Sequence, residues 1–377
     1  MKMVFLINSL EGGGAERVIS TLAAYLVRAK QCVITVVTLH PSSCWYDLPP
    51  SVKVRHLRTG TLCVGPGKVL AIPLLALEFA RLLRALRPDA TLSLLVRSNL
   101  VHLLTRWFGN RSKIFISERC DSMGPYSGRG LRDRVMRLLI RRLYPGATGI
   151  IAISEGVKDS LVKLGVPGGP VVPIYNPQDV AGVQLKSRGP IDADVDLGPP
   201  GAKRLIAVGR LVDQKDHRTL LRALKLIREE VDARLIVLGD GPLRESLKAY
   251  AESLGVLDAA SWLGWRSNPF AIMARCDLFV FTSKYEGFGN VLIEAMACGL
   301  PIVSTDCPSG PREILDDGRY GTLVPVGDSE AVARAVTKIL LDKPLYEALR
   351  GGGYERAAQF DVGLIGPKYL KIVGQAR

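Results

Sequence analysis

The most informative stretch of the chain lies in its second half and reads Phe281-Thr282-Ser283-Lys284-Tyr285-Glu286-Gly287-Phe288-Gly289-Asn290-Val291-Leu292-Ile293-Glu294. An apolar run ends near Ser283, a glycine-rich loop follows, and an apolar segment then runs from Asn290 to Cys298 before Gly299. This order predicts a strand, a loop and a helix, with Asn290 as the helix cap, because Asn is a preferred N-cap and Gly a common helix stop. It places one acid, Glu286, on the loop and another, Glu294, about one turn inside the helix.

The same alternation of strand and helix extends through the whole chain. Short apolar runs occur in the second half at 204–209, 234–239, 261–264, 278–282, 301–305 and 321–326, and in the first half at 3–9, 33–39, 90–96, 113–117 and 149–154. The segments between them have helical periodicity. Strands that alternate with helices predict parallel sheets with right-handed crossovers, formed here twice. We therefore expect an α/β protein with two Rossmann-like, doubly wound domains that face an interdomain cleft.

The domain boundary is predicted from composition. Residues 176–201 are rich in Pro, Gly and Asp and lack sustained apolar periodicity, which is typical of a linker. The expected domains are 1–175 and 202–360. Residues 361–377 are expected to form a C-terminal helix that packs back on the first domain. A length of 377 residues suits two domains of about 150 residues each.

The basic excess lies entirely in the first half. The net charge is +14, and residues 1–175 hold 24 Lys and Arg against 10 Asp and Glu, whereas residues 176–377 hold 26 of each kind. Six arginines fall between Arg129 and Arg142, on a segment with leucines at helical spacing. Such a basic amphipathic helix predicts contact with an anionic membrane surface through Arg134, Arg137 and Arg141. An ordinary packing helix is the alternative. We expect no nucleic acid, because aromatic residues and nucleic-acid motifs are missing from the segment.

The distribution of cysteines and the hydropathy of the chain predict its cellular location. The seven cysteines are scattered without a C-x-x-C pair, which favours a reducing compartment. The apolar run at the N-terminus is too short for a signal peptide, and the most apolar window, 69–77, is too short to span a bilayer. The expected location is the cytoplasm, peripheral on the cytoplasmic face of the inner membrane. Asp192-Ala193-Asp194 resembles a metal-binding D-x-D, but it lies in the predicted linker, so we expect solvated charge there and neither metal nor cofactor.

Two further loops suit anions. Glu11-Gly12-Gly13-Gly14-Ala15-Glu16-Arg17 joins the first predicted strand to its helix, and the amides of Gly13 and Gly14 could approach an anion there. A tight turn, with Glu16 complementing the helix dipole, is the alternative. Arg17 stands where a dinucleotide fingerprint has its third glycine, which argues against a nicotinamide oxidoreductase. The second loop follows Gly209 and carries Arg210 and Lys215, two cations suited to a diphosphate, although solvated loop charge would look the same.

Taken together, these motifs resemble the retaining glycosyltransferases of family four, which have the two-domain GT-B fold. The resemblance covers nearly the whole chain. Its carriers are the loop 12–17, Gly209-Arg210-Leu211 with Gln214-Lys215, Gly239-Asp240-Gly241-Pro242, the pair Glu286 and Glu294, Gly310-Pro311-Arg312-Glu313-Ile314 and the segment 323–328.

The resemblance implies a nucleotide-sugar donor, expected to be a UDP-sugar, held mainly by the second domain, 202–360, and an acceptor held by the first, 1–175. Arg210 and Lys215 would bind its diphosphate. Glu294 would accept hydrogen bonds from the ribose, and Glu286 would face the donor sugar as a nucleophile or an orienting group. The remaining donor contacts implied are Gly13, Gly14, Gly209, Gly287, Phe288, Gly289, Asn290 and Val291, with Trp265 and Arg266 at the base.

One departure from the family pattern concerns the first domain. Many relatives carry a histidine directly after Ser-Glu. This chain reads Ile116-Ser117-Glu118-Arg119 and so has an arginine at that position. Arginine stays charged and cannot act as a general base, so Arg119, like Glu16, becomes a candidate for binding the acceptor or a phosphate.

The motif set resembles bacterial enzymes that extend lipid-linked oligosaccharides or surface polysaccharides. It implies a metal-independent retaining glycosyltransferase that moves a hexose or N-acetylhexosamine to a polyprenyl-diphosphate-linked glycan. A soluble transferase that makes a small glycoside and a polyanion-binding protein on an inactive transferase fold are the alternatives.

Overall fold

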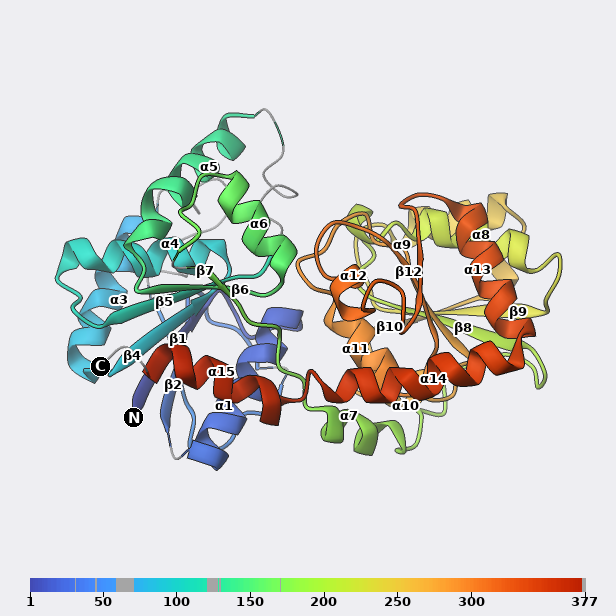
Figure 1. Ribbon diagram of the computed structural model, residues 1–377, viewed down its shortest axis with the longest axis horizontal. Helices are drawn as coiled ribbons and strands as arrows, with labels where there is room; N and C mark the ends of the chain where they lie inside the picture. The colour runs from blue at the N-terminus through green and yellow to red at the C-terminus, as the bar shows by residue number, and fades with distance from the viewer. Residues whose placement is uncertain are drawn as a thin grey trace. The chain divides into compact units, whose positions relative to one another are not determined.

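The computed structural model describes residues 1–30, 32–44, 46–58, 71–120, 128, 130–169 and 171–374. The chain divides into two compact units (Figure 1). Unit 1 comprises Met1–Gln178 together with Val362–Arg377, and unit 2 comprises Asp179–Asp361. The polypeptide therefore leaves unit 1 after Gln178 and returns to it at Val362, and the Val362 amide donates to the Gln178 carbonyl at 2.8 Å.

Unit 1 is built on a parallel sheet of seven strands in the order β3-β2-β1-β4-β5-β6-β7. The strands are β1 (Lys2–Ile7), β2 (Val33–Thr38), β3 (Lys53–His56), β4 (Ala90–Leu94), β5 (Lys113–Glu118), β6 (Gly149–Ala152) and β7 (Val171–Pro173). The helices are α1 (Gly14–Lys30), α3 (Ile72–Leu86), α4 (Val96–Leu104), α5 (Leu131–Leu143), α6 (Glu155–Lys163) and α15 (Val362–Gly374), with 3₁₀ turns η2 (Thr105–Phe108) and η3 (Tyr144–Gly146).

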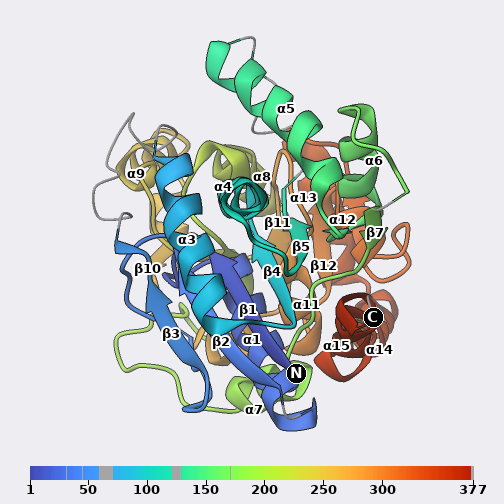
Figure 2. The same cartoon turned by 90° about the vertical axis from the view of Figure 1, so that its left-hand side faces the viewer.

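Helices cover both faces of this sheet, and α15 completes one of them. Helix α15 lies against α1 (Figure 1), and its Ile365, Tyr369 and Val373 are buried in the same core as Phe5 and Phe115 of the central strands. Helices α3, α4 and α5 form a neighbouring group in unit 1 (Figure 2).

Unit 2 has a parallel sheet of six strands in the order β10-β9-β8-β11-β12-β13. The strands are β8 (Lys203–Val208), β9 (Ala233–Leu238), β10 (Ala260–Gly264), β11 (Leu278–Phe281), β12 (Ile302–Thr305) and β13 (Thr322–Val324). The helices are α7 (Val180–Ser187), α8 (His217–Ile227), α9 (Arg244–Ser253), α10 (Pro269–Met273), α11 (Asn290–Ala297), α12 (Pro311–Ile314), α13 (Ser329–Leu341) and α14 (Lys343–Ala358), with 3₁₀ turns η4 (Asp213–Lys215) and η5 (Leu257–Ala259).

The predicted fold class is confirmed, and the differences are local. Every apolar run predicted as a strand is one, whereas β3 and β7 were not predicted. The prediction that Asn290 caps α11 is wrong: Gly289, with φ 101°, occupies the N-cap, and Asn290 is the first helical residue. Where the sequence suggested a linker, residues 180–187 form α7, because the Asp179 side chain caps the helix and α10 packs against it.

The strand orders locate the candidate ligand sites. In each sheet the direction of winding reverses once, between β1 and β4 in unit 1 and between β8 and β11 in unit 2. Ligands of open α/β sheets bind outside the carboxyl ends of the strands at this point. In unit 2, the expected ligand-binding loops are therefore those that follow β8 and β11. None of the helices that the structure describes is long and apolar enough to cross a membrane.

Candidate active site

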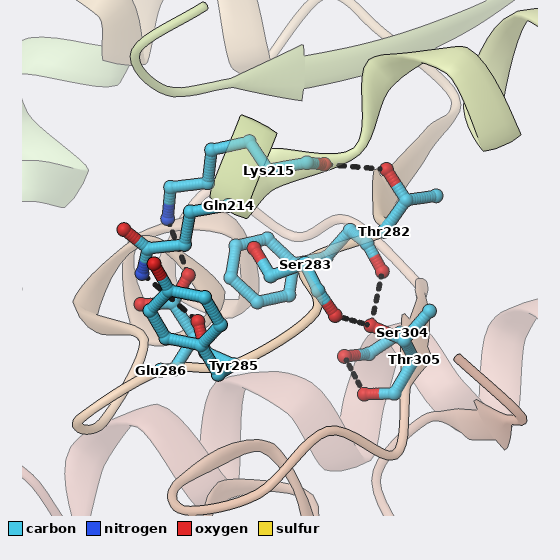
Figure 3. A network of polar contacts seen from close by, with 9 residues as sticks. Gln214, Lys215, Thr282, Ser283, Tyr285, Glu286, Ser304 and Thr305 are labelled. Carbon is cyan, nitrogen blue, oxygen red and sulfur yellow. Dashed lines mark hydrogen bonds and ion pairs between the residues drawn. The ribbon is translucent and has the colours of Figure 1, made fainter. Parts of the chain in front are cut away.

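Lys215 and Glu286 meet at the switch point of unit 2. The Lys215 Nζ donates to Glu286 Oε1 at 2.5 Å, and the two side chains are 18% and 10% exposed (Figure 3). The ammonium also lies 4.9 Å from the centroid of the Phe281 ring. The sequence predicted the two residues on separate loops, and the structure joins them. An ammonium has three protons to donate, and Glu286 accepts one of them, so the pair still has donors to offer an anion.

Polar contacts between the two loops hold this pair in place. Gln214 Nε2 donates to the Tyr285 carbonyl at 2.9 Å, and the Lys284 amide donates to the Gln214 carbonyl at 2.8 Å. Thr282 Oγ1 donates to the Lys215 carbonyl at 3.0 Å (Figure 3). The backbone of each loop is thus fixed by the other, which keeps the charged groups preorganised.

Arg210 lies on the same loop as Lys215 and is exposed. Its backbone is set by close approach to the loop after β9, where Leu211 donates to the Asp240 carbonyl at 3.0 Å. Gly239 has φ 130°, and a Cβ there would overlap the Gly209 carbonyl. Glycine is therefore required for the two loops to touch, and their contact leaves the Arg210 guanidinium at the surface.

The loop between β11 and α11 carries the remaining predicted donor residues. The Glu286 amide donates to the Pro308 carbonyl at 3.2 Å, and Phe288 is 2% exposed and packs against the ring of Phe360. The first amides of a helix lack intrahelical acceptors, so the start of α11, which includes Asn290 and Val291, is suited to phosphate oxygens. Glu294 lies one turn further along and is 5% exposed among apolar neighbours.

The glycine loop of unit 1 leads directly into α1. Tyr46 Oη donates to the Gly13 carbonyl at 3.1 Å, and the Arg17 guanidinium lies 5.3 Å from the Tyr46 ring centroid. A Cβ on Gly13 would overlap the Glu16 carboxylate, so Glu16 folds back over the loop. Helix α1 begins at Gly14, which places this loop at the carboxyl end of β1.

Arg119 lies in the interior of unit 1. It is 6% exposed, and its guanidinium donates to Ser117 Oγ at 3.2 Å and to Asn176 Oδ1 at 2.5 Å. Asn176 stands two residues before the point where the chain leaves unit 1. This geometry makes Arg119 a link between β5 and the exit segment. Sequence reasoning identified the position but not its partner, because Asn176 is 57 residues away.

Glu118 is fully buried beside this link. Its carboxylate accepts hydrogen bonds from Tyr144 Oη at 2.6 Å and from the amides of Arg119 and Cys120 at 3.0 and 3.3 Å. Burial raises the pKa of Glu118 to about 6, although these hydrogen bonds act in the opposite direction. The group was not predicted as functional, and in the structure it anchors η3 to β5.

Glu118 gives a testable dependence of stability on pH. Its pKa in the folded state exceeds the value of about 4.3 in an unfolded chain, so folding favours the protonated acid. That contribution is present below about pH 4.3 and is lost as the pH rises through about 6. We expect the free energy of unfolding of the parent, relative to Glu118→Gln, to fall by about 2 kcal/mol between about pH 4 and pH 7. Urea unfolding at several pH values measures it, and a difference independent of pH would contradict the expectation.

The loop after β10 carries the two residues predicted at the nucleotide base. Trp265 is 57% exposed. Arg266 instead binds Asp194 with both terminal nitrogens, at 2.8 and 2.7 Å, and Asp192 at 3.1 Å. Its guanidinium holds the pKa of Asp194 below the ordinary value. The two acids are mostly exposed, as expected of solvated charge, but they also pair with an arginine that lies 74 and 72 residues further along the chain.

Helix α5 exposes apolar residues as well as arginines. Met136 and Ile140 are buried, whereas Leu131, Val135 and Leu138, which share one face, are 80%, 39% and 54% exposed. Arg134 and Arg141 are exposed, and the half-buried Arg137 donates to the Gly128 carbonyl at 3.0 Å. Arg129 lies outside the described residues. An open pocket of about 620 Å³ adjoins the helix, lined by Ile72, Leu100, Leu104, Trp107, Leu138, Leu139, Arg142 and Leu143. Exposed apolar side chains that gather on one face are a common feature of interaction sites.

Two family models and two relatives that match this chain are described as glycosyltransferases, and together they span nearly its whole length. The family model described as glycosyl transferases group 1 matches residues 194–356, and a glycosyl transferase 4-like domain matches residues 13–177. The N-acetylgalactosamine-N,N'-diacetylbacillosaminyl-diphospho-undecaprenol 4-alpha-N-acetylgalactosaminyltransferase of Campylobacter jejuni is 32% identical over 374 residues, which cover 99% of each chain. A second Campylobacter jejuni protein, a GalNAc-alpha-(1->4)-GalNAc-alpha-(1->3)-diNAcBac-PP-undecaprenol alpha-1,4-N-acetyl-D-galactosaminyltransferase, is 23% identical and covers 100% of this chain and 99% of its own.

Solved structures share the architecture. The sucrose-phosphate synthase of Thermosynechococcus elongatus superposes with a TM-score of 0.83 at 20% identity, over 100% of this chain and 99% of that chain. The Anabaena protein HepE, in complex with UDP and glucose, gives a TM-score of 0.78 at 23% identity over 99% of both chains. These likenesses establish the fold with two parallel sheets flanked by helices.

Proposed function

Because this chain belongs to the group 1 glycosyltransferases, we propose that it transfers a hexose or N-acetylhexosamine from a UDP-sugar to a polyprenyl-diphosphate-linked glycan, with retention of configuration. The observation that carries the proposal is the Lys215–Glu286 pair at the switch point of unit 2, with Arg210 exposed on the same loop. Two cations and a carboxylate at the carboxyl edge of a parallel sheet suit a substrate with both a diphosphate and a sugar.

Each group then has a chemical task. The bond between the anomeric carbon and the diphosphate oxygen breaks, and a bond to the acceptor oxygen forms. The departing diphosphate takes the electron pair of the broken bond and, in the end, the proton of the acceptor hydroxyl, and the charges of Arg210 and Lys215 offset its developing negative charge. Glu286 faces the sugar, as nucleophile or orienting group, and Lys215 fixes its position. The start of α11 supports the phosphates, and Glu294 accepts hydrogen bonds from the ribose.

The acceptor assignment is supported by two observations. Both Campylobacter jejuni relatives are named for acceptors linked to undecaprenol through a diphosphate. The sequence of residues 1–175, nearly all of unit 1, also carries the whole net charge of +14. An anionic, membrane-held acceptor would be drawn to such a unit. The glycine loop with Glu16 is our candidate contact for the acceptor, and the inner face of the membrane is the proposed location.

A panel of UDP-sugars tests the function. We expect one UDP-sugar to release UDP at a rate that rises strongly when a polyprenyl-diphosphate-linked glycan is added. Release with a water-soluble acceptor alone would favour the transferase of small glycosides. No release with any donor, combined with binding of polyanions, would favour the inactive transferase fold.

Turnover is expected to survive removal of divalent metal. The proposed site offsets charge with Arg210, Lys215 and backbone amides, so saturating EDTA should change the rate by less than about twofold. Rates measured with EDTA, and again after addition of Mn²⁺ in excess, check this. Complete loss with EDTA and recovery with Mn²⁺ would contradict it, because a carboxylate metal site would then be needed.

We further propose that α5 lies on anionic membrane. Its exposed leucines could enter the interface while Arg134, Arg137 and Arg141 attract lipid headgroups, each by about 1 kcal/mol near the surface. Reversing all three to Glu should weaken co-sedimentation with anionic vesicles and slow transfer to the lipid-linked acceptor, with donor affinity unchanged.

The control for this variant carries the same charge change on unit 2. It reverses Arg319, Arg334 and Arg350, which pair with nearby acids on the surface. Binding of the parent should also weaken at higher salt, because the Debye length shrinks. A parent that does not bind vesicles at low salt, or equal binding by both triple variants, would reject the membrane contact.

A further inference from the structure

The segment between α7 and β8 is tied to the residues that follow β10. Asp192 and Asp194 both bind the Arg266 guanidinium, and Arg266 Nε donates to the Leu263 carbonyl at 3.1 Å. Two more side chains make similar contacts: Asn268 Nδ2 donates to the Lys186 carbonyl in the last turn of α7 at 2.9 Å, and Arg275 Nη2 donates to the Gly189 carbonyl at 3.0 Å.

The ion pairs of Arg266 with Asp192 and Asp194 differ from ordinary surface ion pairs. Isolated exposed pairs contribute little to stability, because holding two long side chains in one geometry costs conformational entropy. The Arg266 side chain is only 17% exposed, and Asp194 binds it in the bidentate geometry that fixes the plane of a guanidinium. Asp194, Asp192 and the Leu263 carbonyl together hold the Arg266 guanidinium in one orientation.

The loop held in this way is continuous with the proposed diphosphate site. Gly239 donates to the Gly264 carbonyl at 2.8 Å, and the loop of Gly239 touches the loop of Arg210, as described above. In the sheet, β10, β9, β8 and β11 are neighbours in that order. Three spacings of about 4.8 Å therefore separate the strand that leads to Glu286 from the strand that leads to Trp265, about 14 Å in all. An elongated donor with its diphosphate at β8 would extend its base toward β10.

We propose that Asp192 and Asp194 are positioning residues for the nucleotide base, because by holding Arg266 they keep the neighbouring Trp265 in place to stack on it. The proposal rests on the proposed function, since it requires a nucleoside diphosphate at the loop of Arg210. A tryptophan 57% exposed beside a fixed arginine is a suitable stacking platform for an aromatic ring. The acids act through Arg266 and do not touch the donor.

The test compares inhibition by UDP with inhibition by inorganic diphosphate. For D192N/D194N, we expect the inhibition constant of UDP and the KM of the donor to rise by about 3- to 10-fold, the range that one aromatic contact provides. The inhibition constant of inorganic diphosphate, which has no base, should stay within about twofold of the parent value, as should kcat. Trp265→Ala should give the same pattern.

A double-mutant cycle separates positioning from direct contact. If the acids act through Arg266, then Arg266→Gln and D192N/D194N raise the UDP constant by the same factor, and combining them adds nothing. The matched control is Asp196→Asn, which removes an exposed acid from the same segment, 3.9 Å from Arg234. It should behave as the parent.

Three results would overturn the proposal. Unchanged UDP inhibition in D192N/D194N or in Trp265→Ala would remove the role in base binding. Equal losses for UDP and inorganic diphosphate would show that the acids support the site in general. Equal inhibition constants of UDP and inorganic diphosphate for the parent would also reject the proposal, because the base would then add no affinity. If neither compound inhibits the parent, the proposed donor site itself is rejected.

Discussion

Replacement of Lys215 or Arg210 by Ala is expected to lower turnover by roughly 10²- to 10³-fold, equivalent to about 2–4 kcal/mol of transition-state stabilisation. Each residue would neutralise charge that develops on the departing diphosphate, and that charge is larger in the transition state than in the bound donor. The Lys215 variant also removes the partner of Glu286, which is 2.5 Å away and almost buried. Without Lys215, the Glu286 carboxylate would repel the diphosphate instead of orienting the sugar.

The control for this prediction is Lys284→Ala. Lys284 follows β11 in the neighbouring loop and pairs with Asp213 at 2.7 Å, with 38% of its side chain exposed. Its removal changes the same amount of charge near the site and should alter kcat by less than about threefold. Steady-state rates with saturating donor and acceptor measure all three variants. If both Lys215→Ala and Arg210→Ala stay within threefold of the parent, the diphosphate assignment is wrong.

Gly310→Ala is expected to lower the free energy of unfolding by about 2–5 kcal/mol and to abolish most activity. Gly310 has φ 99°, and a Cβ there would overlap the Phe288 carbonyl and the backbone atoms next to it. A left-handed conformation costs a non-glycine residue about 1–2 kcal/mol, and an overpacked contact adds about 1–3 kcal/mol. Because the displaced backbone belongs to the loop between Glu286 and α11, donor binding should weaken along with stability.

Gly327→Ala separates strain from steric overlap. Gly327 also has a positive φ, 81°, but a Cβ there would meet no described atom within 4 Å. Its replacement should therefore cost only the conformational part, about 1–2 kcal/mol. Urea unfolding of both variants and the KM for the donor give the comparison. Equal destabilisation of the two would mean that the loop yields to the added methyl group.

The architecture could be predicted because buried parallel strands appear as continuous apolar runs. Strand β3 was missed for the opposite reason: its four residues, Lys53–His56, are all exposed and show no apolar periodicity. Strand β7 has only three residues and ends at Pro173. The N-cap of α11 was misassigned because Gly289 and Asn290 are both acceptable caps, and the choice depends on the backbone angle of Gly289.

The sequence could predict which loops form the site, but not which side chains pair with each other there. The glycine loops and charged residues stand out in the sequence, yet the Lys215–Glu286 pair joins residues 71 positions apart. The same is true of Arg119 with Asn176 and of Arg266 with Asp194. The Lys215–Glu286 pair depends on β8 and β11 being neighbours in the sheet, whereas the other two depend on the path of the segment that leaves unit 1 and continues to β8. On α5, helical spacing indicated an apolar stripe, but the structure was needed to show that Leu131 and Leu138 face outward.

The return of the chain to unit 1 at Val362 has a consequence for biosynthesis. A ribosome must produce all of unit 2 before it reaches α15, at about 5–20 residues per second. For on the order of ten seconds or more, the nascent unit 1 therefore lacks Ile365, Tyr369 and Val373, and the core surface that they cover beside α1 is open. Unit 2 is continuous in sequence and can fold as it emerges, whereas unit 1 begins first and is completed after it. During this interval, chaperones that bind nascent chains would find exposed apolar surface on unit 1.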